Sequence, residues 1–221
     1  MGAQVMNLTL HGVGRAPRAL GPSEADLWIS TPRLLALLDV IAGRDDVRLL
    51  VDDGNASDVE ILLPALRERG MRASFFVVAG KLGEPGFLAA ADVAALAEAG
   101  MPIGVHGMRH RPWRGLGDRD LTDELVHAKR LIEEAAGRPV AEAACPFGAY
   151  DRRVLRRLRE LGYERVYTSD GGMARREAWL QPRTSVRATF DGGSVAALRR
   201  RESGLRRSAV RRAKVALKRR R

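Results

Sequence analysis

The sequence predicts an α/β fold with a largely parallel sheet or barrel, and two observations carry this prediction. Between residues 33 and 170, short apolar segments typical of buried strands alternate with amphipathic segments typical of helices. The chain has 221 residues, 45% of them hydrophobic, so it can bury the core of a single domain of the larger α/β kind. No apolar run reaches the length of about 20 residues that a membrane-spanning helix needs.

The expected elements follow one another along this region. We expect strands at 47–51, 73–79, 103–106, 140–145 and 165–168. We expect helices at 33–41, 57–70, 92–99, 122–136 and 151–161, several of them ending at a glycine. At the start of the second helix, Ser57 and Glu60 have the spacing of a capping box, in which the two side chains satisfy free backbone N–H groups.

The positive charge lies at the C-terminal end. The formal net charge is +11, and residues 192–221 alone hold twelve Lys and Arg and one acid. We therefore predict a neutral folded domain over 1–191 and a basic tail over 192–221, either an amphipathic helix or a disordered solubilising segment. A basic amphipathic helix over 199–221 would contact an anionic membrane surface. Nucleic acid is a less favoured partner, because no aromatic residue interrupts the basic ones.

Two features bear on the compartment of the protein. The segment Met1–Asn7 has neither the basic start nor the apolar run of a secretory signal. Cys145 is the single cysteine, which agrees with a reducing compartment. We expect a cytoplasmic protein, with peripheral contact at the inner membrane surface through the tail.

Two short motifs supply carboxylates and imidazoles. Asp52 and Asp53 follow the strand expected at 47–51, and His106 and His110 begin the loop after the strand expected at 103–106. Two histidines and one carboxylate suit a divalent metal such as zinc, cobalt or iron, and the spare carboxylate can act as a general base on water. An Asp-Asp-Gly sequence is also typical of a simple turn. The same ligand set also occurs in iron oxygenases, a further alternative.

The polar residues share their position relative to the strands. Asp52, His106, Phe147 and Asp170 each fall at the C-terminal end of an expected strand. In barrels of alternating strands and helices, these ends meet on one face, where catalytic groups gather. The placement supports a single site.

These residues resemble the polysaccharide deacetylase family, the NodB-homology carbohydrate esterases that remove N-acetyl groups from amino sugars. The resemblance covers roughly residues 47–172 and rests on four ordered motifs: Val51-Asp52-Asp53-Gly54, Ala73-Ser74-Phe75-Phe76-Val77, His106-Gly107-Met108-Arg109-His110 and Pro146-Phe147-Gly148. It implies a distorted (β/α) barrel and the metal-dependent deacetylation of an N-acetylated amino sugar or glycan.

The resemblance also implies roles for individual residues. Asp52 is expected to be the general base. The implied ligands of a divalent metal, most readily zinc, with cobalt, nickel, manganese and iron as alternatives, are Asp53, His106 and His110. The backbone N–H near Phe147 is expected to stabilise the oxyanion, with Gly148 permitting the close approach. Trp113, as a wall for the sugar or as a cover of the barrel mouth, and Asp170 are further expected substrate-site residues.

The chain departs from the family pattern in three places. Ala144 stands where the family often has an arginine that orients the base, Asp170 lacks the partner tryptophan, and no histidine follows His127 to act as general acid. In a rearranged branch of the family, an N-terminal strand supplies this histidine, and the segment 8–14 with His11 resembles that strand; a surface histidine beside a turn is the alternative. The missing groups also leave open a non-catalytic carbohydrate-binding relative. We expect the sugar to be linked to a nucleotide or a lipid.

Overall fold

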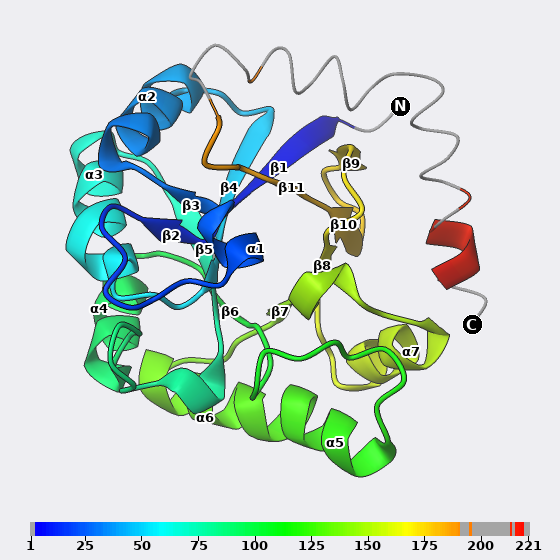
Figure 1. The fold of residues 1–221 in the computed structure, drawn as a ribbon. Helices are drawn as coiled ribbons and strands as arrows, with labels where there is room; N and C mark the ends of the chain where they lie inside the picture. Colours follow the sequence, from blue (N-terminus) through cyan, green and yellow to red (C-terminus); the bar gives the residue numbers. More distant parts are fainter. Residues whose placement is uncertain (1–2, 191–194, 196–212, 214, 219–221) are drawn as a thin grey trace.

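A parallel sheet that curls into a nearly closed barrel forms the centre of the molecule, with helices on its outer side (Figure 1). The computed structural model describes residues 3–190, 195, 213 and 215–218. Within these residues, the strands of the barrel sheet are β1 (Gln4–Leu10), β4 (Val47–Asp53), β5 (Ala73–Val77), β6 (Ile103–Val105), β7 (Glu142–Ala144), β8 (Arg165–Thr168), β9 (Met173–Arg175), β10 (Leu180–Pro182) and β11 (Thr184–Ser185).

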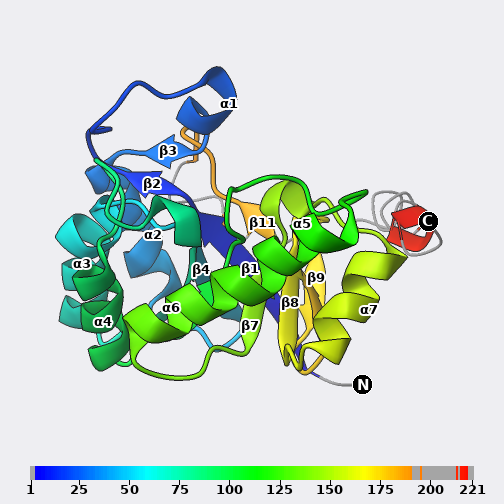
Figure 2. The ribbon, with the colours of Figure 1, turned by 90° about the horizontal axis from the view of Figure 1, so that it is seen from below.

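The helices of the described chain cover the barrel, and a small excursion lies over one end of it. The helices are α1 (Pro22–Ala25), α2 (Thr31–Ile41), α3 (Leu63–Glu68), α4 (Ala90–Glu98), α5 (Asp118–Thr122), α6 (Ala128–Ala136) and α7 (Arg152–Glu160). The excursion contains α1 and the paired short strands β2 (Gly12–Val13) and β3 (Trp28–Ile29), and it stands over the end of the barrel toward which β1 runs (Figure 2).

The order of the strands brings the two ends of the folded chain together. The strands run β10-β8-β7-β6-β5-β4-β1-β11 and pair in parallel, while β9 pairs antiparallel with β1. Between β1 and β10, the Asn7 side-chain amide donates to Gln181 Oε1 and to the Pro182 carbonyl, both at 2.9 Å. The barrel is therefore closed by side chains on this side, and the segment after β10 lies next to β1.

Apolar side chains fill both faces of the sheet. The larger core lies between the sheet and the outer helices. A smaller one inside the barrel consists of Leu50, Phe76, Ala144 and Tyr167, with the Phe76 and Tyr167 rings edge-on at 5.1 Å. Burial on both faces explains why the strands read as continuous apolar runs.

The expected elements are present, with one local correction at Ser57. The predicted capping box is wrong: the helix there begins as a π-helical turn, Asp58–Leu62, and the Ser57 side chain makes no cap. Instead, Ser57 Oγ accepts a hydrogen bond from the backbone N–H of Val13 at 3.3 Å. The contact with β2, which is distant in sequence, replaces the local cap. The strands β9, β10 and β11 follow the region in which the sequence pattern predicted elements.

The predicted tail lies almost wholly outside the described residues. In 192–221 the structure describes only residue 195 and the helical residues 213 and 215–218, so the amphipathic helix predicted over 199–221 stays a prediction. In the described part of the chain, no helix has the length and apolar character to cross a membrane.

Candidate active site

The C-terminal ends of three adjacent strands place the acidic and imidazole side chains together. Asp52 and Asp53 are the last residues of β4, and His106 directly follows β6. β5 pairs in parallel with both of these strands. Because parallel strands end on the same face of a barrel, the residues meet there, as the sequence predicted.

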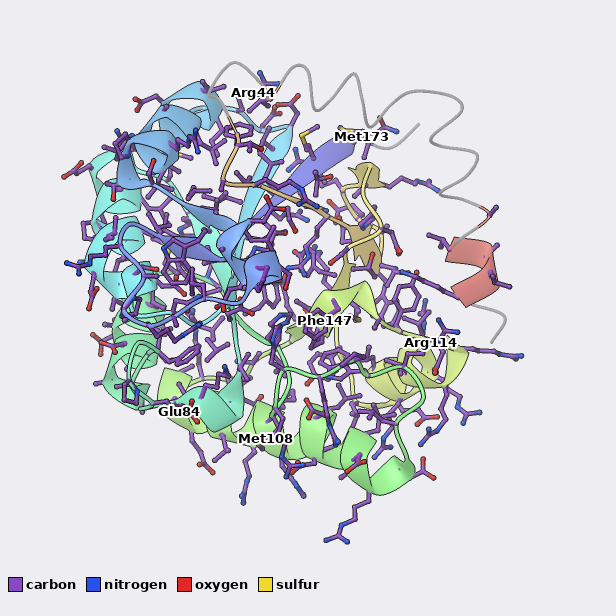
Figure 3. All side chains as sticks on the ribbon, viewed as in Figure 1. Arg44, Glu84, Met108, Arg114, Phe147 and Met173 are labelled. Atoms are coloured by element: carbon purple, nitrogen blue, oxygen red, sulfur yellow. The ribbon has the colours of Figure 1, made fainter. Side chains whose placement is uncertain are left out.

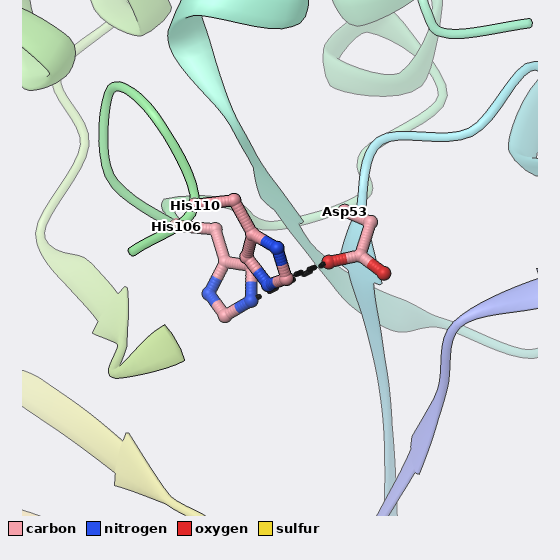
Figure 4. A group of neighbouring side chains, drawn as sticks. All are labelled: Asp53, His106 and His110. Atoms are coloured by element: carbon pink, nitrogen blue, oxygen red, sulfur yellow. Dashed lines mark ion pairs between the residues drawn. The ribbon is translucent and has the colours of Figure 1, made fainter. Parts of the chain in front are cut away.

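Asp53, His106 and His110 form a compact set of candidate metal ligands (Figure 4). Asp53 Oδ1 lies 3.6 Å from His106 Nε2 and 3.2 Å from His110 Nε2. The ligand atoms of the three residues all lie within 4.8 Å of one another. One carboxylate and two imidazoles are a donor set that suits zinc and other divalent metals and leaves positions open for water and substrate.

The protonation states and the burial of His106 and Asp53 are those expected of residues that bind a metal cation. His106 Nδ1 donates to the Ala144 carbonyl at 2.8 Å, which leaves the lone pair of Nε2 facing Asp53. Burial lowers the pKa of His106 to about 3, so the ring is neutral, as a ligand must be. Asp53 Oδ1 is buried and has no hydrogen-bond partner among the described residues. Burial raises the pKa of this carboxyl to about 6.

The backbone of the described chain is strained at this site. The non-glycine residues there with a left-handed backbone are Asp53 (φ 79°), His110 (φ 48°) and Phe147 (φ 56°). This conformation costs of order 1–3 kcal/mol per residue and persists where the surrounding structure imposes it, most often at functional sites. All three residues line one cavity.

Asp52 differs from Asp53 in that it forms an ion pair with a buried arginine. Arg183 Nη1 donates to Asp52 Oδ1 at 2.6 Å, and both side chains are almost fully buried. Burial alone would raise the pKa of Asp52, but the Arg183 charge, with smaller contributions from His106 and His11, lowers it to about 2. Asp52 is therefore an ionised carboxylate held in a fixed orientation.

Arg183 was not predicted from the sequence. It follows β10, where its backbone N–H donates to the Thr168 carbonyl at 3.0 Å, and its guanidinium lies 5.7 Å from the Phe76 ring centre. Arg183 therefore gives Asp52 the cationic partner that the family often supplies from the position where this chain has Ala144. A single arginine after a short apolar segment is a weak signal, and only the closure of the barrel brings it to Asp52.

Glu124, also missed by sequence reasoning, holds the loop that carries the two histidines. Its side chain is fully buried in the helical stretch Asp123–His127. Oε2 accepts from the backbone N–H of Met108 at 2.8 Å, and Oε1 accepts from Arg111 Nε at 3.0 Å. The carboxylate thus fixes the loop between His106 and His110.

The turn Pro146–Gly148 faces His110. Phe147 is 65% exposed, and its ring centre lies 4.7 Å from that of His110. Figure 3 shows Phe147 near the centre of the molecule in the view down the barrel. A Cβ at Gly148 would lie 2.6 Å from the backbone nitrogen of Ser169. Glycine is therefore required at this position, because the turn packs closely against the residue that follows β8.

His11 enters the same cavity from the end of β1. The cavity has a volume of about 470 Å³, and its lining includes His11, Asp52, Asp53, His106 and His110. His11 Nδ1 is buried with no hydrogen-bond partner among the described residues, while the His11 carbonyl accepts from Asn55 Nδ2 at 3.1 Å. The structure brings this histidine to the candidate site.

Two expected substrate-site residues are placed differently. Trp113 is fully buried, so its ring offers no face to a sugar, and its position agrees with the alternative of a cover packed at the barrel. Asp170 lies beneath the turn, where Oδ2 accepts from Tyr150 and Thr168 at 2.8 Å and Oδ1 pairs with Lys218 at 2.6 Å. Both oxygens of Asp170 are thus engaged by the protein itself.

Comparison with known proteins defines the class of this fold and site. A family model described as polysaccharide deacetylase matches residues 40–166, more than half of the chain. The chain belongs to the polysaccharide deacetylase family. His11 and Arg183 lie outside the matched segment.

The individual relatives agree in fold. YxkH of Bacillus subtilis (strain 168), named as a polysaccharide deacetylase, is 23% identical over 172 residues, which are 78% of this chain and 59% of YxkH. The deacetylase PplD of Streptococcus pyogenes, solved in complex with acetate, has a TM-score of 0.79 at 16% identity and covers 90% of this chain and 99% of its own. IcaB from Ammonifex degensii has a TM-score of 0.70 at 20% identity, with 89% and 97% covered. The expected distorted (β/α) barrel is confirmed.

Proposed function

We propose that the protein is a metal-dependent hydrolase that removes the N-acetyl group of an amino sugar or glycan. The observation that carries the proposal is that one cavity is lined by the candidate ligands Asp53, His106 and His110. The same cavity is lined by Asp52, a carboxylate outside the ligand set, and by His11, which can donate a proton. Membership of the polysaccharide deacetylase family supports the same substrate class.

The metal ligands in this proposal are Asp53, His106 and His110. A divalent metal bound there, most readily zinc, would polarise the acetamide carbonyl and acidify water. The neutral His106 ring is held for this purpose by its Nδ1 hydrogen bond to the Ala144 carbonyl.

The remaining residues move protons and stabilise charge. Asp52, ionised and oriented by Arg183, takes a proton from the attacking water, whose oxygen bonds to the acetamide carbon. His11 donates a proton to the sugar nitrogen as the C–N bond breaks, so that acetic acid and a neutral amine are released while the proton taken from water remains on Asp52. Phe147 lines the cavity, and the backbone N–H near it would donate to the developing oxyanion.

Two alternatives are less well supported. The absence of the family's arginine and late histidine would favour a non-catalytic carbohydrate-binding protein. However, Arg183 contacts Asp52 and His11 lines the cavity, so groups of both kinds are present at the site. An iron oxygenase would share the two histidines and one carboxylate, yet it has no evident use for a buried, ion-paired Asp52 beside them.

We also propose a cytoplasmic protein whose basic tail, 199–221, contacts anionic lipid at the inner membrane surface. The support is the charge of this segment, which at +11 equals the net charge of the whole chain. The substrate would then be made inside the cell, as a nucleotide-linked or lipid-linked sugar.

Zinc content and acetate release, measured on the same preparations, test the deacetylase proposal. The wild type should bind about one zinc, and His110→Ala should lose it, because two ligands remain. Asp52→Asn should keep the zinc but lose turnover by at least ~10²-fold, since the base is gone. Near-normal turnover of Asp52→Asn would remove Asp52 from this role. Absence of metal in every preparation would favour the binding protein, and a strict iron preference would favour the oxygenase.

A further inference from the structure

Two basic side chains lie in the candidate catalytic cavity without a place in the deacetylation chemistry. Arg18 and Lys81 line it together with the aromatic ring of Phe87. Lys81 Nζ lies 4.2 Å from the centre of that ring, and the Arg18 guanidinium carbon lies 4.7 Å from it. Two cations from separate segments of the chain thus contact the same aromatic ring.

The two cations differ in how far their charge is neutralised. Arg18 makes a two-bond ion pair with Glu24, at 2.9 and 2.5 Å, yet its Nε is buried with no hydrogen-bond partner in the described chain. For Lys81, no ion pair with a carboxylate is present among the described residues, and its contact is the face of Phe87. Among the described residues, Glu24 is the one carboxylate that forms an ion pair with either cation, so the Lys81 ammonium group has no carboxylate in direct contact.

Both cations are fixed relative to the catalytic groups. Lys81 ends the short helical turn Ala79–Lys81, in which Ala79 N–H donates to the Gly107 carbonyl and Gly80 N–H to that of Met108, at 2.9 and 3.0 Å. These bonds tie the turn to the loop between His106 and His110. Through Nη2, Arg18 reaches Asn55 Oδ1 at 3.4 Å, and the Asn55 amide in turn holds the His11 carbonyl.

This arrangement restricts the chemistry of the bound molecule. A partly buried cation with no carboxylate partner stabilises an oxyanion by a charge-assisted hydrogen bond. A neutral glycan has only hydroxyl and amide groups, which gain less from such a charge. The cavity holds about 470 Å³, enough for a sugar and one substituent, so an anion next to the acetamido-bearing ring would reach Lys81.

We propose that Lys81, with Arg18 beside it, forms a subsite for a phosphate or carboxylate attached to the N-acetylated sugar. The inference rests on the proposed deacetylase function and narrows its substrate class from neutral glycans to anionic amino sugars. Phe87 positions the ammonium group of Lys81, and Glu24 positions the guanidinium of Arg18.

The test compares three probes that differ in charge. N-acetylglucosamine 1-phosphate carries a phosphate, N-acetylmuramic acid carries a carboxylate, and the methyl glycoside of N-acetylglucosamine is neutral. Acetate release is measured with zinc-loaded wild type, Lys81→Gln, and Lys81→Arg, which retains the charge. Lys129→Gln is the matched control, because Lys129 is also half-buried but pairs with Glu133 on the outer helix α6.

For an anionic probe, Lys81→Gln should raise KM about tenfold, the loss expected for one hydrogen bond to a charged group, with kcat little changed. Lys81→Arg should restore most of the loss, and the neutral probe should be unaffected by either change. The anionic probe that shows the effect identifies the phosphate or the carboxylate as the recognised group. Equal effects on anionic and neutral probes, or no effect on any, would overturn the subsite.

A second readout separates this inference from the proposed function. If the wild type releases acetate from none of the probes, the deacetylase proposal fails for them, and binding is then measured by titration calorimetry on the same proteins. Tighter binding of an anionic probe that is lost in Lys81→Gln and kept in Lys129→Gln would still support the subsite. Equal binding of all probes to both proteins would exclude it.

Discussion

The middle of the chain and its two outer segments supply different kinds of group to the mouth of the barrel. The segment 47–148 provides side chains at successive strand ends, among them Asp53 and His106. The outer segments provide partners for them: His11 after β1, Arg183 after β10, and Lys218, which bonds to Asp170 and to the Gly148 carbonyl. The middle carries the candidate metal ligands, and the outer segments carry the proposed proton donor and two cations.

This difference shows which requirements of a site depend on sequence order and which do not. Ligands on neighbouring parallel strands need the spacing that the strand–helix repeat provides. A cation that compensates a buried carboxylate needs only to lie close to it, because the Coulomb energy depends on distance. Arg183 therefore stands 131 positions from Asp52 and still meets it at 2.6 Å.

Of the changes considered, the removal of Arg183 from the outer segment should have the largest effect, a loss of stability. Arg183→Met would leave Asp52 buried and unpaired, and we expect a loss of about 3–5 kcal/mol in the free energy of unfolding. Denaturant unfolding measures it, and the double variant with Asp52→Asn should recover much of the loss, because the uncompensated charge is then removed. If the single and double variants are equally stable, the ion pair is not the reason why Arg183 is buried.

A smaller effect, on rate alone, is expected for His11. If it donates a proton to the departing nitrogen, His11→Ala should lower kcat for an N-acetyl sugar by ~10²-fold or more. Cleavage of 4-nitrophenyl acetate should change little, because nitrophenolate leaves without a proton. His127→Ala is the control, since His127 is exposed and pairs with Asp123. An equal loss for both substrates would assign His11 to binding or to the fold.

The smallest effect on catalysis is expected for the tail. Deleting 199–221 removes Lys218, whose contacts with Asp170 and the Gly148 carbonyl are partly exposed, so kcat should change by only a few-fold. Sedimentation with vesicles of anionic lipid should show reduced binding at low salt, because the tail charge is screened at high salt. Unchanged vesicle binding of the deleted protein would rule out the tail as a membrane contact.

Much of the site could be predicted because its residues stand at the ends of recognisable strands. Asp52, Asp53, His106, His110 and the turn at Gly148 lie together as expected. Glu124 could not be predicted, because a glutamate within a helical stretch ordinarily faces water, and only its contacts with the loop after β6 show that it is buried. The burial of Trp113 was likewise decided by packing that its sequence neighbours do not reveal.

By itself, the sequence determined the α/β class, the strand ends that carry the candidate metal ligands, and the family, because apolar periodicity and short motifs are local properties of a chain. Only the tertiary structure decided which buried carboxylate is paired with an arginine, where that arginine comes from and which cations line the cavity. These depend on the closure of the barrel between β1 and β10, which brings together groups far apart in sequence, and short-range patterns carry no record of such contacts.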